Sequence, residues 1–487
     1  MKNYNTDVCV IAGGPAGLAA AIAAAEGGAN VILLEKGRTT GGAANMGMGP
    51  LGIGTRLAKE NMVDLDLERA FKIFMDYTHW RVDARLVKAY LEKSGDTIAW
   101  LERMGVEFAA IAKYFPSSQQ TWHMVKPPVG KPGPRSASIM CKLMTDRALE
   151  LGVQILYETP ACRLERGEEG YISAVMARNG NEDVRVECLA AVLATGGFGD
   201  NPEMIREKMG YEWGKDLFSF RIPGLTGDGI RMALEVGAQT TDVNMELVLY
   251  LPEIGDAGLP TQLWKQPKTL VLNDRCERIM DESLMENTTF SGNAVAVQHG
   301  HMAWSILDSG LVDHYTNHEM DFISNVHLGQ NAEGLDEKAR AAVANGVTSI
   351  VVADSIAELA KGMGVDEAAL TQAIEEYNEG CVRRDDYFFK KKEHLIPLNG
   401  PTYYAVKMFP GGYGTLGGIK INYKTEVLDR ENQVIEGLYA AGTDACSIFG
   451  DSYVFVLPGN TMGFALNSGR MAGENAAKYV FPEDEEG

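Results

Sequence analysis

The pattern of apolar and polar positions near the N-terminus predicts strands that alternate with helices. Residues 8–12 (VCVIA) form a short apolar run, which is typical of a strand buried on both faces of a sheet. The segment LAAAIAAAEGG at residues 18–28 predicts a closely packed helix, and NVILLEK at residues 30–36 predicts a second strand. Two later apolar runs, residues 190–194 and 435–442, predict further strands, and the alternation indicates an α/β fold.

A helical pattern is present near residue 370. In VDEAALTQAIEEYNEGCVRR the residues Leu370, Ile374, Tyr377 and Cys381 follow helical spacing. They share one face of the predicted helix, and this stripe favours core packing.

Composition limits the kind of protein. A chain of 487 residues is long enough for two or three structural units. The formal net charge of −21 repels nucleic acid and anionic membranes, so we expect neither as a partner. No apolar run approaches the ~18 residues of a spanning helix. We also expect no signal peptide, because a strand and a glycine turn begin almost at once.

The seven cysteines are dispersed, and none forms a C-x-x-C pair. Such a pattern predicts a reducing, cytoplasmic location and argues against structural zinc or an iron–sulfur cluster. We therefore expect no metal site in this chain.

A glycine turn follows the first predicted strand. Gly13, Gly14 and Gly17 precede the first helix, where backbone N–H groups and a helix N-terminus can hold a pyrophosphate. Glu35, at the end of the second strand, is placed to accept the ribose hydroxyls. The usual G-x-G-x-x-G pattern would have glycine at position 12, and Ala12 fits if its φ stays negative. Together the turn and Glu35 favour nucleotide binding over simple core packing.

Further glycine-rich strand ends indicate which dinucleotide binds. The second strand leads into GRTTGGAANMGMG (residues 37–49), a second glycine loop for which an extended flavin dinucleotide has more use than a nicotinamide dinucleotide. Strands also run into small residues at 195–197 and at Gly442, with Asp444 placed to bond the ribitol chain. Four such segments in this order predict FAD.

Beyond these segments the chain resembles the flavoprotein family of fumarate reductase and succinate dehydrogenase, which includes urocanate reductases and 3-ketosteroid dehydrogenases. The resemblance covers nearly the whole length, including GLTGDGIRMALEVGA, LVLNDRCERIMDE, YNEGCVRRDDYF, GPTYYAVKM, TLGGIKIN, GLYAAGTDA and NSGRMAGENAA. It implies a Rossmann-like α/β FAD-binding domain interrupted by an α+β capping domain. The implied bounds are residues 1–245 and 410–487 for the FAD-binding domain and 246–409 for the cap.

The resemblance also implies how FAD is held. The segment PGNTMGFALNSGRMAGENAAKYV implies a helix whose first N–H groups stabilise negative charge on the flavin pyrimidine edge. Relatives with covalent flavin carry a histidine in the second glycine loop, which has none here, so we expect noncovalent FAD. The expected cofactor-binding residues are Gly13, Gly14, Ala16, Gly17, Glu35, Lys36, Gly42, Ala43, Ala44, Gly47, Cys162, Ala194, Thr195, Gly196, Asp228, Gly442, Asp444, Gly459, Asn460, Thr461 and Met462.

The positions that resemble the substrate site depart from the dicarboxylate-binding relatives. Those relatives read His-His-Thr-Met-Gly-Gly where this chain reads YGTLGG, and Arg-Leu-Gly-Gly-Asn where it reads VLPGN. Tyr413 and Gly414 thus replace both histidines, and Val456 replaces the arginine. Glu286 stands where the proton-donating arginine is expected. Two buried carboxylates need fixed positive partners, so fumarate and succinate are poor substrate candidates.

Aromatic and apolar residues replace these cations. Tyr250, Tyr453 and Val456 are the expected substrate-binding residues, which suits a neutral, hydrophobic molecule with a carbonyl group. Ketosteroid-oxidising relatives hold the ketone with a tyrosine hydroxyl and a small donor before the same Gly-Gly pair, and Tyr413 and Thr415 match that arrangement. The glycines around them would let the chain pass close to flavin and substrate. A tyrosine that closes the domain junction stays an alternative.

This pattern predicts an FAD-dependent oxidoreductase that reduces or introduces a C=C bond next to a carbonyl in an enone or ketosteroid-like substrate. Hydride would be exchanged with flavin N5 while Tyr413 and Thr415 bond the carbonyl oxygen. A buried Glu286 would handle the proton, with a solvated loop carboxylate as the alternative.

Two other functions stay open. One is the flavin subunit of an electron-transfer assembly. The chain has no haem or cluster motif and needs an electron-donor protein, a soluble reductant or NAD(P)H. The other is a reductase of an unsaturated carboxylate whose cations come from Lys126, Lys131 or Arg135. Arg278 is expected to anchor the cap, and His123 either lines the entrance or is exposed.

Overall fold

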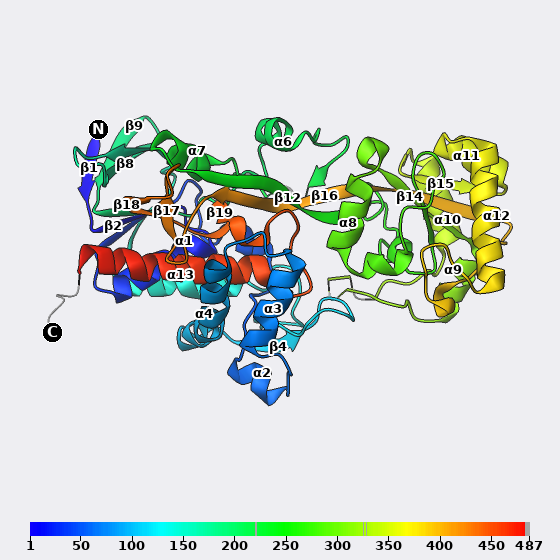
Figure 1. Ribbon diagram of the computed structural model, residues 1–487, viewed down its shortest axis with the longest axis horizontal. Coiled ribbons are helices and arrows are strands. Elements are labelled where there is room, and N and C mark those ends of the chain that lie inside the picture. The colour runs from blue at the N-terminus through cyan, green and yellow to red at the C-terminus, as the bar shows by residue number, and fades with distance from the viewer. Residues whose placement is uncertain (220–221, 325, 328, 483–487) are drawn as a thin grey trace. The chain divides into compact units, whose positions relative to one another are not determined.

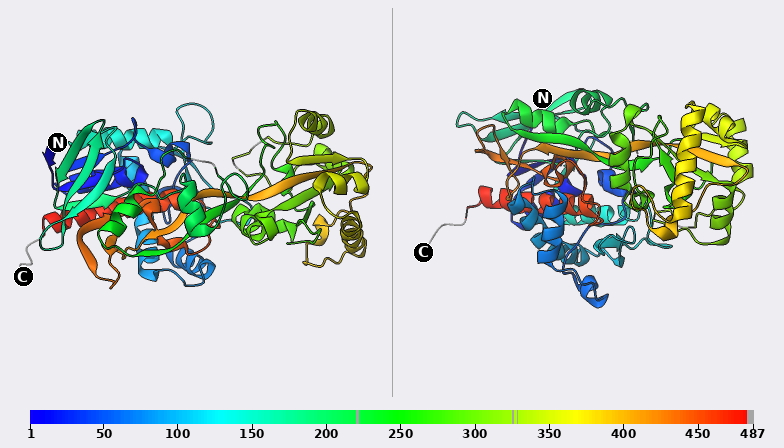
Figure 2. Two further views of the ribbon diagram at one scale, coloured as in Figure 1. Left: turned by 90° about the horizontal axis from the view of Figure 1, so that it is seen from above. Right: turned by 45° about the vertical axis from the view of Figure 1, so that its right-hand side comes forward.

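The computed structural model describes residues 1–219, 222–324, 326–327 and 329–482. The chain divides into two compact units (Figure 1, Figure 2). The first unit contains residues 1–210, 221–246 and 414–487, and the second contains residues 211–220 and 247–413. In the part of the chain that is described, no helix is both long and apolar enough to cross a bilayer.

A largely parallel sheet forms the centre of the first unit (Figure 1). Its described strands are, in spatial order, β17 (Glu426–Leu428), β18 (Val434–Ala440), β10 (Ala190–Leu193), β2 (Val8–Ile11), β3 (Val31–Leu34) and β6 (Gln154–Leu156). Neighbouring strands are parallel except β17, which is antiparallel to β18. Every residue of β2, β3 and β10 is buried, which explains why these strands read as continuous apolar runs. The four strands predicted from such runs are confirmed.

Two helices of this unit, α1 (Pro15–Glu26) and α13 (Asn460–Val480), pack against each other (Figure 1). Glycines of α13 make this close approach possible. A Cβ at Gly469 would lie 2.1 Å from the carbonyl oxygen of Ala16, and one at Gly473 would lie 2.2 Å from that of Ala20. The two backbones therefore meet with little side chain between them, which accounts for the alanines and glycines in both helices.

The remaining elements of the first unit surround this centre. In one further sheet β1 (Lys2–Asn5), β9 (Glu182–Glu187), β8 (Ile172–Asn179) and β7 (Ala161–Arg166) lie in that order, and β4 (Phe108–Ala112) pairs with β5 (Trp122–Val125). The helices are α2 (Arg56–Glu60), α3 (Leu67–Tyr77), α4 (Ala84–Arg103), α5 (Ser138–Glu150), α6 (Pro202–Met209) and α7 (Asp228–Glu235). Side-chain oxygens of Thr55, Asp66, Asp83 and Asn201 accept backbone N–H groups and begin α2, α3, α4 and α6.

The second unit is built on antiparallel strands. β16 (Tyr403–Ile419) lies between β14 (Ala303–Asp308) and β15 (Ile350–Ala353), and β13 (Leu270–Leu272) pairs with β14. β11 (Phe218–Ser219) and β12 (Thr240–Tyr250) also pair with β16. β19 (Ala445–Cys446) pairs with Gly417 and Gly418 of β16, which belong to the first unit. The helices are α8 (Thr288–Ala296), α9 (Ser309–Asn317), α10 (Leu335–Ala344), α11 (Ile356–Met363) and α12 (Glu367–Arg383). The chain of β12 and that of β16 each continue from one unit into the other.

Two features of the second unit confirm sequence predictions. The α12 residues Leu370, Ile374, Tyr377 and Cys381 are buried in its hydrophobic core. Arg278 anchors this unit through ion pairs with Glu282, at 2.6 Å between Nη2 and Oε2, and with Asp386.

The Arg278 cluster also includes a buried lysine. Lys390 Nζ lies 2.9 Å from Glu282 Oε2. Burial raises the pKa of Glu282, but Lys390 and Arg278 outweigh this effect and hold the pKa below its usual value. The paired carboxylate is therefore charged inside the unit.

The contact between α1 and α13 predicts a strong effect of one methyl group. Gly473→Ala should lower the free energy of unfolding by about 2 kcal/mol or more, because the new Cβ would overlap the backbone of α1. Urea unfolding of the purified protein measures this change.

Gly133→Ala is the matched control, since the nearest atom to its Cβ would be the carbonyl oxygen of Lys131, 4.0 Å away. Its effect should stay within about 0.5 kcal/mol. Equal stability of the two variants would show that the two helices can separate at no cost.

Candidate functional site

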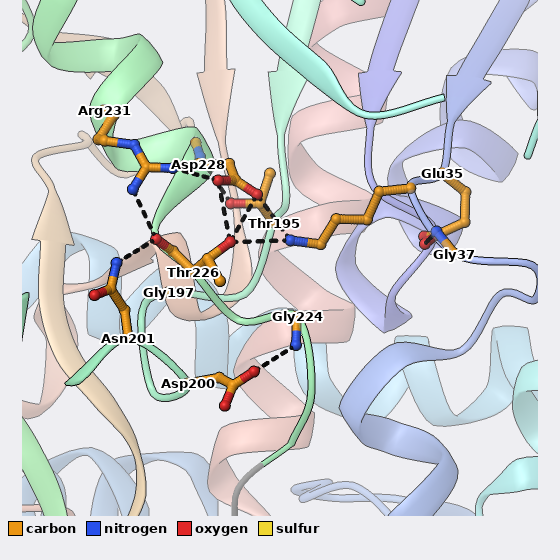
Figure 3. A network of polar contacts seen from close by, with 12 residues as sticks. Glu35, Gly37, Thr195, Gly197, Asp200, Asn201, Gly224, Thr226, Asp228 and Arg231 are labelled. Carbon is orange, nitrogen blue, oxygen red and sulfur yellow. Dashed lines mark hydrogen bonds and ion pairs between the residues drawn. The ribbon is translucent and has the colours of Figure 1, made fainter. Parts of the chain in front are cut away.

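Four loops meet at one edge of the central sheet. They follow the carboxyl ends of β2, β3, β10 and β18 and contain residues 12–17, 35–47, 194–201 and 441–446. In open α/β sheets, ligands bind outside the carboxyl ends of the parallel strands. Figure 3 shows polar contacts of residues from two of these loops, 35–37 and 195–201, and from the segment 224–231.

Glu35 connects the first two loops. Its Oε2 accepts the N–H of Gly13 at 2.7 Å, and its Oε1 accepts the N–H of Gly37 at 2.6 Å. A carboxylate has about four acceptor positions, so each oxygen keeps a lone pair for a further hydroxyl. Thr159, three residues before Cys162, donates its N–H to the Glu35 carbonyl oxygen and brings the start of β7 beside this loop.

The start of α1 is open to a ligand. A Cβ at Gly14 would meet no atom within 4 Å. The first N–H groups of a helix, here including those of Ala16 and Gly17, have no partner within the helix. Space and N–H donors at a positive helix end are what an anionic pyrophosphate requires.

The backbone conformation of Ala12 differs from the predicted one. Its φ is +80°, so the expectation that this residue keeps a negative φ is wrong. The reason lies in Gly17: a Cβ there would be 1.8 Å from the Ala12 carbonyl oxygen, so the turn brings that oxygen directly against the helix. A left-handed conformation costs a residue other than glycine roughly 1–2 kcal/mol. The close turn is kept in spite of this cost.

The second glycine loop packs on the first one and on α13. Gly41 donates its N–H to the Gly13 carbonyl oxygen at 2.7 Å, just before a 3₁₀ turn that spans Gly42–Met46 and contains Ala43 and Ala44. A Cβ at Gly47 would lie 2.4 Å from Met462 Cε. Both glycine loops and the start of α13 therefore belong to one packed group.

Asp444 holds the ends of β10 and β18 together. Its fully buried carboxylate accepts the N–H of Gly197 at 2.9 Å and both the N–H and the hydroxyl of Thr195. The Thr195 hydroxyl in turn accepts the N–H of Gly229 at 2.9 Å, in the first turn of α7. Burial raises the pKa of Asp444, and the N–H and hydroxyl donors oppose that rise.

Lys36 ties β3 to α7. Its Nζ lies 2.7 Å from Asp228 Oδ2 and also donates to the Thr226 hydroxyl (Figure 3). Arg231 forms a further ion pair with Asp228. The Lys36 and Asp228 side chains keep 32% and 24% of their surface exposed, so solvent screens this pair.

The geometry of these loops fits a dinucleotide, and a comparison with known protein families indicates which dinucleotide binds. Residues 7–461 match the family described as FAD binding domain. The chain belongs to this flavoprotein family. The predicted family is thereby confirmed, and the two glycine loops, the open start of α1 and the acceptor Glu35 are the parts that would hold FAD.

Three relatives show how far the similarity extends. A vinyl phenol reductase from Lactiplantibacillus plantarum is 33% identical over 493 residues, covering 98% of each chain. A flavocytochrome c3 fumarate reductase in its open conformation has a TM-score of 0.70 at 26% identity, over 98% of this chain and 79% of that one. The 3-ketosteroid-delta4-(5alpha)-dehydrogenase from Rhodococcus jostii RHA1 has a TM-score of 0.76 at 24% identity, over 98% of each chain, and shares the fold.

These comparisons confirm the predicted α/β fold class, with an FAD-binding and a capping architecture. They also confirm the enzyme class: this flavoprotein is an oxidoreductase that acts on CH–CH bonds and reduces or forms a C=C bond.

In this flavoprotein a buried acid of β12, which the sequence did not reveal, contacts the start of α13. The Thr461 hydroxyl donates to Glu246 Oε2 at 3.2 Å, and the Thr461 N–H donates to the Tyr453 hydroxyl at 3.0 Å. Glu246 is only 3% exposed, and burial raises its pKa to about 8. The available sequence signal was one acid within the apolar stretch MELVLY.

The predicted substrate and catalytic residues divide between the units. In the first unit, Tyr453 is buried with its ring centroid 5.0 Å from that of Phe449, and the Val456 carbonyl oxygen accepts the N–H of Gln119 at 2.8 Å. Thr415 is 2% exposed, and its Oγ1 accepts the N–H of Phe198 at 3.4 Å.

Three candidates lie in the second unit. Tyr250 stacks on Phe218 with ring centroids 5.5 Å apart. Tyr413 is 49% exposed, and Glu286, half-buried, ends a 3₁₀ turn.

His123 corrects a second prediction, because it is neither exposed nor at an entrance. It is fully buried in β5, where its Nε2 pairs with the Thr55 hydroxyl at 2.8 Å and its Nδ1 with the Thr121 carbonyl oxygen at 3.0 Å. Burial lowers its pKa to about 4, so the ring is neutral at physiological pH. Lys126, one of the alternative cations, forms an exposed ion pair with Glu107.

Proposed function

We propose that this flavoprotein reduces or introduces a C=C bond that is conjugated to an oxygen function in a neutral, hydrophobic substrate. The second unit, whose sequence-predicted bounds are 246–409, acts as the cap over the flavin. Enones, ketosteroid-like compounds and vinyl phenols share this chemistry, since in each the oxygen is conjugated with the alkene. The vinyl phenol reductase that is 33% identical over 98% of this chain supports the proposal.

The observation that carries the proposal is the character of the residues beside the start of α13. Tyr453, Val456 and the buried Glu246 lie there, with the rings of Phe449 and Phe455 at 5.0 and 5.6 Å from that of Tyr453. A dicarboxylate would need fixed cations at such a place, and Tyr453, Val456 and Glu246 supply none. A neutral aromatic or alicyclic molecule meets no such cost.

The residues of the site have separate roles in this reaction. Bound FAD supplies hydride exchange at its N5 atom. The start of α1 binds the pyrophosphate, Glu35 binds the ribose, and the N–H groups at the start of α13 face the pyrimidine edge. Tyr413, supported by Thr415, donates a hydrogen bond to the substrate oxygen, where negative charge develops.

Glu286 moves the proton at the carbon next to the polarised group. An electron-donor protein or NAD(P)H supplies the electrons. A reductase of unsaturated carboxylates is the second candidate, since the flavocytochrome fumarate reductase is 26% identical over 98% of this chain. Of the three cations that it could use, Lys126, Lys131 and Arg135, Lys126 is already paired with Glu107 at 2.6 Å.

The first expected outcome concerns FAD attachment. The second glycine loop, residues 37–49, contains no histidine, so all flavin should leave the protein on acid precipitation. Absorbance of the supernatant and of the redissolved pellet measures the two fractions. Yellow colour that stays with the polypeptide would contradict noncovalent binding.

The second expected outcome separates the two substrate classes. Holoprotein reduced anaerobically with dithionite should be reoxidised by a vinyl phenol, cyclohexenone or a 3-ketosteroid enone at least ~10-fold faster than by fumarate, a difference of ~1.4 kcal/mol in the barrier. Stopped-flow absorbance of the flavin measures each rate. Fumarate as the fastest oxidant would overturn the proposal in favour of the carboxylate reductase.

The third expected outcome concerns Tyr413. Tyr413→Phe removes one hydroxyl and keeps the ring, and reoxidation by the best neutral substrate should slow by ~10²–10³-fold, as for loss of one oxyanion donor. Flavin content should stay unchanged.

Tyr387→Phe is the matched control in the same unit, because Tyr387 is 84% exposed. Its single-turnover rate should equal that of the parent. A Tyr413→Phe rate within about threefold of the parent rate corresponds to a change of about 0.6 kcal/mol in the barrier. That result would show that the Tyr413 hydroxyl takes no part in catalysis.

A further inference from the structure

The carboxyl group of Glu246 lies where three segments of the first unit meet. Glu246 ends the part of β12 that belongs to this unit. Its Oε2 accepts the hydroxyl of Thr461, the second residue of α13, at 3.2 Å. A Cβ at Gly414 would lie 3.8 Å from the same oxygen, so the glycine segment passes directly beside the carboxyl group.

Glu246 has no cation to balance it. Among the described residues it forms no ion pair, and the Thr461 hydroxyl is the one hydrogen-bond donor that reaches its carboxyl group. The titratable groups that face it are the Cys446 thiol and the Tyr453 phenol, whose pKa values are raised by burial and by Glu246 itself. Glu282 of the second unit is the opposite case, since two cations contact that buried carboxylate.

A group in this position carries a proton at neutral pH. Burial raises the pKa of Glu246 to about 8, and the Thr461 hydroxyl opposes part of that rise. The geometry leads to the same result, because ionisation would leave a buried charge with a single neutral donor.

The same helix start is where the proposed function places the flavin pyrimidine edge. Reduction adds negative charge at that edge, and an ionised Glu246 would compete with it for the positive end of α13. Two negative charges at one helix end repel each other, so one of them is neutralised by a proton.

We propose that Glu246 is a proton-coupled residue of the flavin site, which binds a proton from solvent whenever the bound flavin is reduced at a pH where its carboxyl group is ionised. This inference rests on the proposed function for the position of FAD. The balance is simple. The flavin takes up two electrons from the reductant and one proton from solvent. One further proton from solvent binds the carboxylate of Glu246 and makes it a neutral carboxylic acid.

Spectroelectrochemical titration of the holoenzyme from about pH 6.5 to 9.5 tests this coupling. Below the pKa of Glu246, one proton enters with each electron pair, and the midpoint potential should fall by about 30 mV per tenfold change in proton concentration. Above the pKa of Glu246, two protons enter with each electron pair. The midpoint potential should then fall by about 59 mV for each tenfold decrease in proton concentration. The slope of the wild-type curve should therefore steepen near pH 8.

Three variants make the result specific. Glu246→Gln should keep the one-proton slope throughout. Thr461→Val removes the donor that favours the ionised form, so the break should move to higher pH and supply the answer if Glu246→Gln does not fold. Glu426→Gln, the same substitution on β17 of the same unit, should leave the break where it is in the parent.

Urea unfolding gives a second readout that needs no substrate. When a carboxyl group has a higher pKa in the folded protein than in the unfolded chain, the free energy of unfolding falls as the pH rises between the two pKa values. For Glu246 this range is from about 4.5 to about 8. Glu246→Gln should therefore become progressively more stable than the parent across that range.

The outcomes are distinct. A break present in the parent and lost in Glu246→Gln supports the coupling, whatever the substrate panel shows. Identical slopes in parent and variant overturn it, even if the stability difference appears and the enzyme reduces enones. Fumarate as the best oxidant overturns the proposed substrate class and leaves the potential measurement valid.

Discussion

The direct backbone contact between α1 and α13 is the constraint on which the flavin site depends. Gly469 and Gly473 place the backbone of α13 against the carbonyl oxygens of Ala16 and Ala20, at positions that no Cβ could share. α1 begins in the first glycine turn, and α13 begins against the second glycine loop. Just after that loop, Leu51 donates its N–H to the Gly459 carbonyl oxygen at 2.8 Å. One packing contact therefore fixes the separation of the two helix N-termini that, in the proposed function, face the pyrophosphate and the flavin pyrimidine edge.

Buried acids in this flavoprotein show what different partners do to a carboxyl group. Asp444 receives three donor groups from the β10 loop and joins two strand ends. Glu282 receives two cations and stays charged in the core of the second unit. Glu246 receives one hydroxyl, and burial then dominates its pKa. Burial raises the pKa of Asp444 and of Glu246, which have neutral donors, and the pKa is held below its usual value in Glu282, which has two cations.

Local sequence patterns predicted much of this arrangement because much of it is local. A short apolar run followed by glycines marks a buried parallel strand and the loop after it, and this sufficed for β2, β3, β10 and β18. Glu35 was predicted because it follows such a strand directly. The family match over residues 7–461 then confirmed the family, and the structural matches over 98% of the chain confirmed the fold.

What the sequence missed depends on contacts between distant positions. Glu246 and Thr461 are 215 residues apart, and nothing in MELVLY shows that its acid faces a helix start. His123 follows a polar stretch that reads as a surface loop, yet β5 buries it against Thr55. Ala12 takes a positive φ because Gly17 allows its carbonyl oxygen to approach the helix, a steric condition that composition does not reveal.

The strand order of the central sheet has a consequence for biosynthesis. β10 lies between β2 and β18, and β18 is made some 240 residues after β10. Until the ribosome has passed residue 440, one edge of β10 has no neighbour, and such an edge is a template for wrong pairing. Residues 247–413 form a nearly contiguous unit that emerges during this interval. The nascent chain therefore completes its inserted unit before it can close the sheet that binds the cofactor, and a chaperone would find its target in the exposed edge of β10.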